Sequence, residues 1–168
     1  TGAAIFVPYT IAPIVNVGGD WTNYNTSGFS ETGSIVTLNG SGNQNITVTA
    51  GGEDYSTLKI NKIGGKVYLS SAPATIARII TLLDLTLGNI VTSAINGSYY
   101  VQIQNTATVI NVSDLSFVEG ACSRQVIAGL PINFTYPIGK LTKYRPEGIQ
   151  GTPLTNSLML GEYYKIDP

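Results

Sequence analysis

The hydrophobic residues of this chain recur mostly at every second position, and the opening segment shows this most clearly. In TGAAIFVPYTIAPIVNV the odd positions from residue 5 onward carry no charged or strongly polar side chain, whereas the even positions are mixed. A period of two predicts an extended strand with one apolar face. Gly18 and Gly19 then predict a flexible joint. We therefore expect a terminal strand and joint over residues 1–19, and a separate body over residues 20–168.

The body shows short alternating segments between glycine pairs and Asn-Gly dipeptides. The expected strands cover residues 34–38, 45–50, 55–60, 66–70, 99–104, 106–112, 124–128, 132–136 and 158–166. Short strands separated by such turns are typical of a sandwich or barrel. The pattern predicts an all-β body, and we find no internal repeat of fixed period in the sequence.

Two stretches are less clear. Residues 72–89 allow a helix, with Pro73 as a first helical residue and Gly88 after its end, but their Ile, Thr and Leu content also allows one strand or two strands around a bend. We favour the strand interpretation because no clean polar helical face is present. Residues 140–157, with Pro146 and Pro153, are expected to form a long surface loop.

The composition narrows the function classes. Charged residues make up 11% of the chain and the net charge is -1, against roughly 25% charged residues in ordinary soluble domains. This balance favours neither nucleic acid nor a membrane surface as a partner. Histidine is absent and Cys122 is the one cysteine, so a histidine-based catalytic triad and an internal disulfide are both excluded. We expect no enzyme activity, no cofactor and no metal, and we expect Cys122 to be a small buried residue.

The neutral polar surface is rich in Asn, Ser and Thr, and it contains six N-glycosylation sequons. They begin at Asn25, Asn39, Asn45, Asn96, Asn111 and Asn133. Sequons also arise by chance in a sheet protein rich in Asn and Thr, so their number alone does not show that the protein is glycosylated. The functional interpretation is a glycosylated extracellular protein whose glycans supply solubility in place of charge.

Other candidate groups have ordinary explanations. The Glu53-Asp54 pair follows two glycines, and we expect it to decorate a turn. The tyrosine pairs Tyr99-Tyr100 and Tyr163-Tyr164 place one ring on each face of a strand. Such rings could form sugar-binding platforms, although cross-strand packing is the simpler explanation.

An apolar terminal strand ahead of an all-β body resembles the donor-strand pilins, in which one subunit's N-terminal strand completes the next subunit. The single cysteine departs from bacterial type 1 pilins, and the low charge with many sequons is more similar to the glycosylated thread filaments of archaea. The resemblance implies an immunoglobulin-like antiparallel β-sandwich and a mature chain whose leader has been removed. It further implies the donor-strand contacts Ile5, Val7, Tyr9, Ile11, Val15 and Val17.

These observations lead to one principal hypothesis and two alternatives. The principal hypothesis is a structural subunit of an extracellular cell-surface filament, polymerised head to tail by insertion of the N-terminal strand into a neighbouring subunit. Its partners would be identical subunits and N-linked glycans, without nucleic acid and without membrane insertion of the mature chain. The alternatives are a viral capsid or spike jelly roll and a carbohydrate-binding adhesin module.

Overall fold

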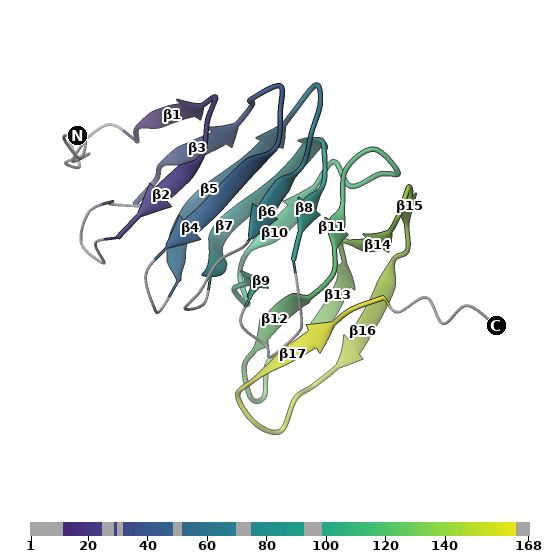
Figure 1. Ribbon diagram of the computed structural model, residues 1–168. Helices are drawn as coiled ribbons and strands as arrows, with labels where there is room; N and C mark the ends of the chain where they lie inside the picture. Colours follow the sequence, from purple (N-terminus) through teal and green to yellow (C-terminus); the bar gives the residue numbers. More distant parts are fainter. Residues whose placement is uncertain are drawn as a thin grey trace.

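The chain folds as a parallel β-solenoid of about four turns (Figure 1). The computed structural model describes residues 12–24, 29, 32–48, 52–69, 75–92 and 99–163. All regular elements within these residues are β-strands, and most neighbouring strands in the two large sheets run parallel. The all-β prediction is therefore confirmed. The immunoglobulin-like antiparallel sandwich is wrong, and so is the resemblance to donor-strand pilins that implied it.

One face of the solenoid is an eight-stranded sheet. Its strands, in spatial order, are β1 (Ile14–Val17), β3 (Ile35–Leu38), β5 (Glu53–Asn61), β7 (Thr75–Leu87), β9 (Tyr99–Ile103), β12 (Cys122–Val126) and β17 (Ser157–Gly161), with β10 (Thr108–Ile110) also paired to β7. All of these pairs are parallel except the last, in which β17 runs antiparallel to β12. The first and last strands of this sheet, β1 and β17, lie at opposite ends of the stack (Figure 1).

The opposite face is a seven-stranded sheet. Its strands, in spatial order, are β15 (Lys143–Tyr144), β14 (Ile138–Lys140), β11 (Val118–Glu119), β8 (Ile90–Val91), β6 (Val67–Leu69), β4 (Gln44–Val48) and β2 (Trp21–Asn23). The pairs β1–β2, β3–β4, β5–β6 and β7–β8 each supply one strand to each large sheet. We call each such pair a rung. Strands β9, β10 and β11 continue the stack beyond the fourth rung.

Strand β7 is the longest element, and it settles the ambiguous stretch over residues 72–89. Its 13 residues pair with β5 on one side, while on the other side its first part pairs with β9 and its second part with β10. The strand interpretation is confirmed for the described residues of this stretch. Alternate side chains of the strand, such as Ala77 and Ile79, are fully buried, as the period-two pattern predicts.

The rungs repeat with unequal lengths. Ile14 pairs with Ile35, 21 residues later, and Ile35 pairs with Thr57, 22 residues later. Between β5 and β7 the offset is already 24 at Glu53, which pairs with Ala77, and register shifts increase it further along the strands. A repeat therefore exists in three dimensions. The search for a fixed period missed it because the number of residues between paired positions changes from rung to rung and also along β5 and β7.

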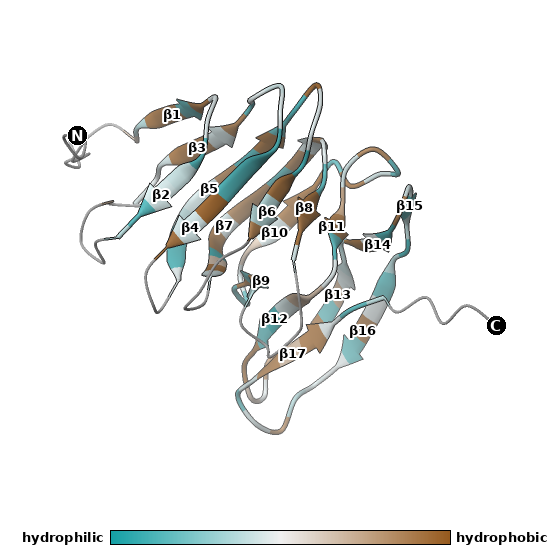
Figure 2. Cartoon of the chain, viewed as in Figure 1, coloured by the Kyte–Doolittle hydropathy of each residue, from teal (hydrophilic) through white to brown (hydrophobic). Residues whose placement is uncertain are grey.

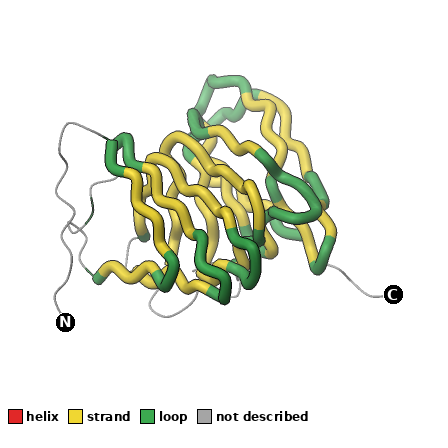
Figure 3. The backbone as a smooth tube through the Cα atoms, turned by 90° about the horizontal axis from the view of Figure 1, so that it is seen from above, coloured by secondary structure: helices red, strands yellow, loops and turns green. Residues whose placement is uncertain are grey.

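The inner faces of the two large sheets supply one hydrophobic core. It includes Val36, Leu38, Ile46, Leu58, Ile60, Val67, Leu83, Leu85, Ile90, Val101, Ile103 and Val118, all fully buried. An aromatic group lies at the side of the first rung, where the Trp21 ring meets Phe29 edge-on at 5.0 Å and Tyr55 at 5.9 Å. The loops at the corners carry the chain from one sheet to the other (Figure 3).

The C-terminal end departs from the solenoid pattern. Strands β13 (Ile132–Tyr136) and β16 (Glu147–Gly151) form a separate antiparallel pair, and the sheet strand β17 follows them. The long loop expected over residues 140–157 is wrong, because β15 and β16 lie within it and β14 ends inside it. Pro146 and Pro153 lie between strands, where their missing N–H groups remove no ladder hydrogen bond.

Candidate functional site

A buried lysine braces one corner of the solenoid. Lys62 follows β5 and is 2% exposed. Its ammonium group donates three hydrogen bonds of 2.7 Å, to the carbonyl oxygens of Gly40 and Gly42 and to Oε1 of Gln44. These use all three of its donors. Burial lowers the pKa of Lys62, because removal from water disfavours the charged form.

Gln44 extends this brace to the first rung. Its Oε1 also accepts a hydrogen bond of 2.8 Å from the backbone N–H of Gly40, and its Nε2 donates to the carbonyl oxygens of Val17, at 2.8 Å, and Gly19. Three successive rungs are therefore joined through two side chains. All the acceptors in the set are neutral, so the arrangement suits a structural role.

On the outer face of the eight-stranded sheet, Asp84 of β7 connects its strand to β5 and to the residue that follows β10. Its carboxylate accepts hydrogen bonds of 2.8 Å from each of Lys59 Nζ, Thr86 Oγ1 and Asn111 Nδ2. Burial by itself would raise the pKa of Asp84, but the hydrogen bonds from Lys59, Asn111 and Thr86 and the charge of Lys59 outweigh it and lower the pKa. This carboxylate therefore serves to hold neighbouring rungs together in its charged form.

Two further ion pairs also connect different rungs. Lys66 Nζ lies 2.7 Å from Glu119 Oε2, and the Arg78 guanidinium contacts the Asp54 carboxylate. The expectation that Glu53 and Asp54 decorate a turn is wrong. Both residues lie in β5, and Glu53 is buried and accepts a hydrogen bond of 2.7 Å from Asn23.

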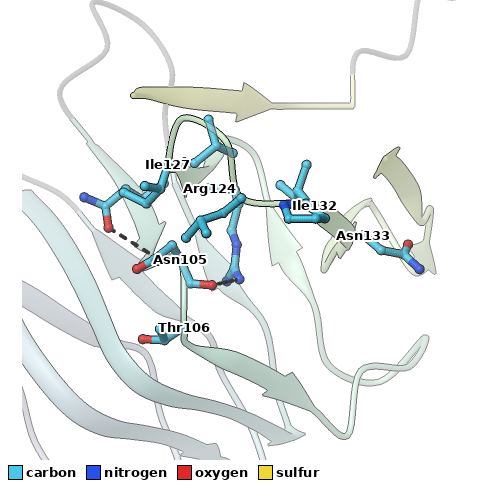
Figure 4. Close-up of a pocket in the computed structure, with 10 residues that line it drawn as sticks. Asn105, Thr106, Arg124, Ile127, Ile132 and Asn133 are labelled. Carbon is cyan, nitrogen blue, oxygen red and sulfur yellow. Dashed lines mark hydrogen bonds between the residues drawn. The ribbon is translucent and has the colours of Figure 1, made fainter. Parts of the chain in front are cut away.

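A pocket of about 280 Å³ opens between β12 and the segment that precedes β10 (Figure 4). Its lining combines neutral hydrogen-bonding side chains with an apolar wall and one cation. The lining residues are Asn105, Thr106, Arg124, Gln125, Val126, Ile127, Leu130, Pro131, Ile132 and Asn133. The Arg124 side chain extends from β12 toward Asn105, which faces it across the pocket (Figure 4).

Arg124 is a buried cation without a carboxylate partner among the described residues. It is 8% exposed. Its Nη1 donates to the carbonyl oxygen of Ala107 at 2.7 Å, its Nη2 donates to that of Asn105, and the guanidinium lies 4.4 Å from the centre of the Phe134 ring. Its Nε is buried and has no hydrogen-bond partner. Burial lowers the pKa of Arg124.

The six sequons fall into different environments. Asn39 and Asn133 are exposed, at a corner and on β13 respectively. Asn45 lies inside β4, is half-buried, and its Nδ2 contacts the Asp20 carboxylate. Asn111 has a positive φ of 62° and donates to Asp84. The remaining two, Asn25 and Asn96, lie outside the described residues.

The predicted donor-strand residues are only partly described. Val15 and Val17 lie in β1, which pairs with β3 of the same chain, and both pack against the core of that chain. Gly18 and Gly19, the expected joint, connect β1 to β2 within the first rung. The other four, Ile5, Val7, Tyr9 and Ile11, lie outside the described residues. The fold therefore gives β1 a place in the solenoid, in contrast to the free arm that the pilin resemblance implied.

The cysteine prediction is confirmed, since Cys122 is fully buried. Burial raises the pKa of its thiol and outweighs the opposing effect of Arg124, so the thiol is a poor nucleophile. Tyr99 and Tyr100 are both half-buried in β9, and Tyr99 packs against the core. Tyr163 is half-buried near the end of the described chain, and Tyr164 lies beyond it.

Sequence reasoning missed the residues that the structure makes most informative. The sequence pattern assigns no role to Lys62 or Gln44, although a lysine next to two glycine-rich corners could have suggested a buried donor for the carbonyl oxygens there. Arg124 was placed in a strand without any further role. No signal in the sequence alone distinguishes it from a solvated arginine.

The two outer edges of the eight-stranded sheet carry no charge. Strand β1 reads IVNV and β17 reads SLMLG. In the described residues β1 pairs only with β3, and β17 only with β12. Ile14 is 69% exposed on β1, while Leu158, Met159 and Leu160 are 49%, 38% and 54% exposed on β17. Figure 2 shows the hydrophobic colour of β17 at this end.

Comparisons with known proteins identify no relative. No family model, no curated protein and no solved structure matches this chain. Within the described ranges, no group of three or more acidic, cysteine or histidine residues could hold a metal ion, and no helix is long and apolar enough to span a membrane.

Proposed function

We propose that this chain is a structural subunit of an extracellular surface filament, and that its copies join end to end through the outer edges of the eight-stranded sheet. The observation that carries this proposal is the state of the two edge strands, β1 and β17. Both are uncharged and expose apolar side chains. Proteins that stay monomeric usually protect sheet edges with lysine, proline or a bulge, and neither strand has one.

The two edges fit each other. Strand β1 has four residues and β17 has five. On β1, Val15 and Val17 face the core, and Ile14 faces outward. On β17, Leu160 lies opposite Ser123 of β12. Leu158 and Leu160 line a depression beside Tyr100 on the outer face of the sheet. Because side chains alternate along a strand, Met159 between them points to the inner face. Joining the edges would align apolar residues on both faces.

The contact between copies would be antiparallel, and it could join an unlimited number of copies. Strand β17 runs opposite to the other strands of its sheet, so the β1 strand of a following copy, in the same orientation, meets it antiparallel. The two joined surfaces differ, which makes the contact heterologous. Heterologous contacts that do not close into a ring produce filaments.

The extracellular placement rests on the surface chemistry. The chain has 11% charged residues and a net charge of -1, and three ion pairs, Lys59–Asp84, Lys66–Glu119 and Asp54–Arg78, engage charges of neighbouring parts of the stack. Asn39 and Asn133 present exposed sequons. Glycans at such positions would supply the solubility that a low-charge filament lacks.

The test compares one charge placed at each edge. We expect the full chain to form linear assemblies in negative-stain micrographs and to sediment as a concentration-dependent series. Ile14→Lys and Leu160→Lys should each abolish these assemblies, because either substitution buries a charge in the joint. Leu154→Lys is the matched control, since Leu154 is 95% exposed and lies between β16 and β17.

Mixing the two edge variants distinguishes the geometry. The Ile14→Lys copy keeps an intact β17 edge and the Leu160→Lys copy keeps an intact β1 edge, so an equal mixture should form heterodimers and stop there. A wild-type chain that stays monomeric at every concentration contradicts the proposal. Dimers formed by Ile14→Lys alone would show a symmetric β17–β17 contact and exclude the head-to-tail filament.

A further inference from the structure

The charge in the pocket beside β12 lacks a counter-ion. Arg124 is 8% exposed, and no described carboxylate pairs with it. Two of its five N–H donors reach the carbonyl oxygens of Ala107 and Asn105, and its Nε has no partner. A buried cation that is balanced only by carbonyl groups and one aromatic ring leaves a positive potential in the adjacent space.

The pocket also offers polar groups that a ligand could engage. The backbone N–H of Asn105 contacts Gln125 Oε1 at 3.5 Å, which is long for a hydrogen bond. A ligand can therefore replace this contact at little cost. Thr106 and Asn133 are exposed at the rim, and their hydroxyl and amide groups both donate and accept.

The opposite part of the lining is apolar. Ile127, Leu130 and Ile132 provide it, and Leu130 is 52% exposed. A sugar ring has hydroxyl groups at its edge and C–H groups on its faces, so it suits a pocket with both kinds of wall. The volume of about 280 Å³ is at the lower end for ligand pockets. It is sized for one sugar residue.

We infer that this pocket binds an acidic monosaccharide, with the ligand carboxylate held beside Arg124 and the ring against Leu130. The inference is independent of filament formation. It also differs from the sugar platforms considered at Tyr99 and Tyr163, because neither tyrosine lines this pocket.

The experiment titrates the full chain, produced without glycosylation so that Asn133 is unmodified, with D-glucuronate and with D-glucose at equal ionic strength. Chemical shift changes in amide NMR spectra report binding. We expect saturable shifts at residues 105–106 and 124–133 with glucuronate, at a Kd in the millimolar range, and binding of glucose weaker by about tenfold or more.

The decisive variant is Gln125→Glu. It places a carboxylate of nearly the same shape in the lining of the pocket, where its negative charge repels the ligand carboxylate, so the fold should be retained while glucuronate binding falls by about tenfold or more. Asn61→Asp, an exposed change of equal charge on β5, should bind as the wild type does. Equal binding of glucose and glucuronate, unchanged binding in Gln125→Glu, or no saturation at about 50 mM ligand would overturn the inference.

Discussion

Lys62 Nζ and Gln44 Oε1 lie 2.7 Å apart across two successive rungs, and both side chains are almost completely buried. Among the described residues, the carbonyl oxygens at this sharp corner lack main-chain partners, and the two side chains provide hydrogen bonds in their place. Buried polar groups without a partner are costly, so the corner depends on both residues.

Replacing Lys62 by methionine should therefore destabilise the fold strongly. The substitution leaves the carbonyl oxygens of Gly40 and Gly42 without this donor, and we expect the free energy of unfolding to fall by about 3 kcal/mol. Urea denaturation measures it. Lys143→Met is the control, because its ion pair with Asp114 is exposed on both sides and should contribute less than about 1 kcal/mol. Equal losses of unfolding free energy in the two variants would show that Lys62 does not stabilise this corner.

Asp84 should give the fold a specific sensitivity to acid. Its pKa is lowered in the folded chain, so its stabilising contribution is complete above the unfolded value of about 3.9 and is lost as pH falls through the folded pKa. Asp84→Asn should lower the free energy of unfolding by about 2 kcal/mol at pH 7, and this difference from the wild type should shrink as the pH falls below the unfolded value of about 3.9.

Urea midpoints at neutral and acidic pH measure the effect of Asp84. The exposed Glu147→Gln change on β16 is the control and should follow the wild type within about 0.5 kcal/mol at neutral pH. An Asp84→Asn difference that stays constant down to pH 2 would show that the charge of the carboxylate is not what the contacts require.

Two glycines with similar backbone angles separate strain from crowding. Gly65 and Gly129 have φ values of 69° and 76°. A Cβ atom on Gly65 would lie 2.4 Å from backbone atoms of Gly42, in the rung beside it, whereas one on Gly129 would meet nothing within 4 Å. We expect Gly129→Ala to cost about 1 kcal/mol from backbone strain, and Gly65→Ala to cost about 3 kcal/mol or more. Thermal and urea unfolding of the two variants checks the difference, and similar costs would mean that the rungs separate easily.

Glycan occupancy should follow exposure. In a glycosylating host, peptide mass mapping should find glycans at Asn39 and Asn133, which are exposed. Asn45 should stay bare, because it is half-buried within β4 and its side chain contacts Asp20. Occupancy at Asn45 with none at Asn39 and Asn133 would contradict the prediction, and bare sequons throughout would weaken the case for an extracellular glycoprotein.

The sequence predicted strands well and their arrangement poorly. For example, the alternation of apolar and polar residues predicts a strand over residues 132–136, and β13 has the same bounds. Asn39-Gly40 and Gly64-Gly65, however, predict hairpin turns as readily as solenoid corners. Both kinds of turn use residues that tolerate unusual backbone angles. Whether the next strand pairs with the previous one or crosses to the other sheet depends on distant contacts, which local pattern does not carry.

The candidate site was also out of reach of pattern analysis, for a different reason. Lysine and arginine are mostly exposed in proteins, so the pattern gives no reason to expect Lys62 and Arg124 to be buried. Their burial follows from partners 18 to 22 residues away for Lys62, and 17 and 19 residues away for Arg124. These distances are set by the lengths of the rungs, and the unequal rungs hide them from any search for a regular period.

The length of β7 has a consequence for how the chain folds. It is the strand that binds the third rung on one side and both β9 and β10 on the other. In stacked-repeat proteins folding can start at any unit and propagate to its neighbours. We expect the nucleus to form around β7, in the middle of the chain, and growth to proceed outward in both directions. The first rung and β17 would then be the last to consolidate and the first to open, so the terminal edges would become competent for pairing only after the centre is complete.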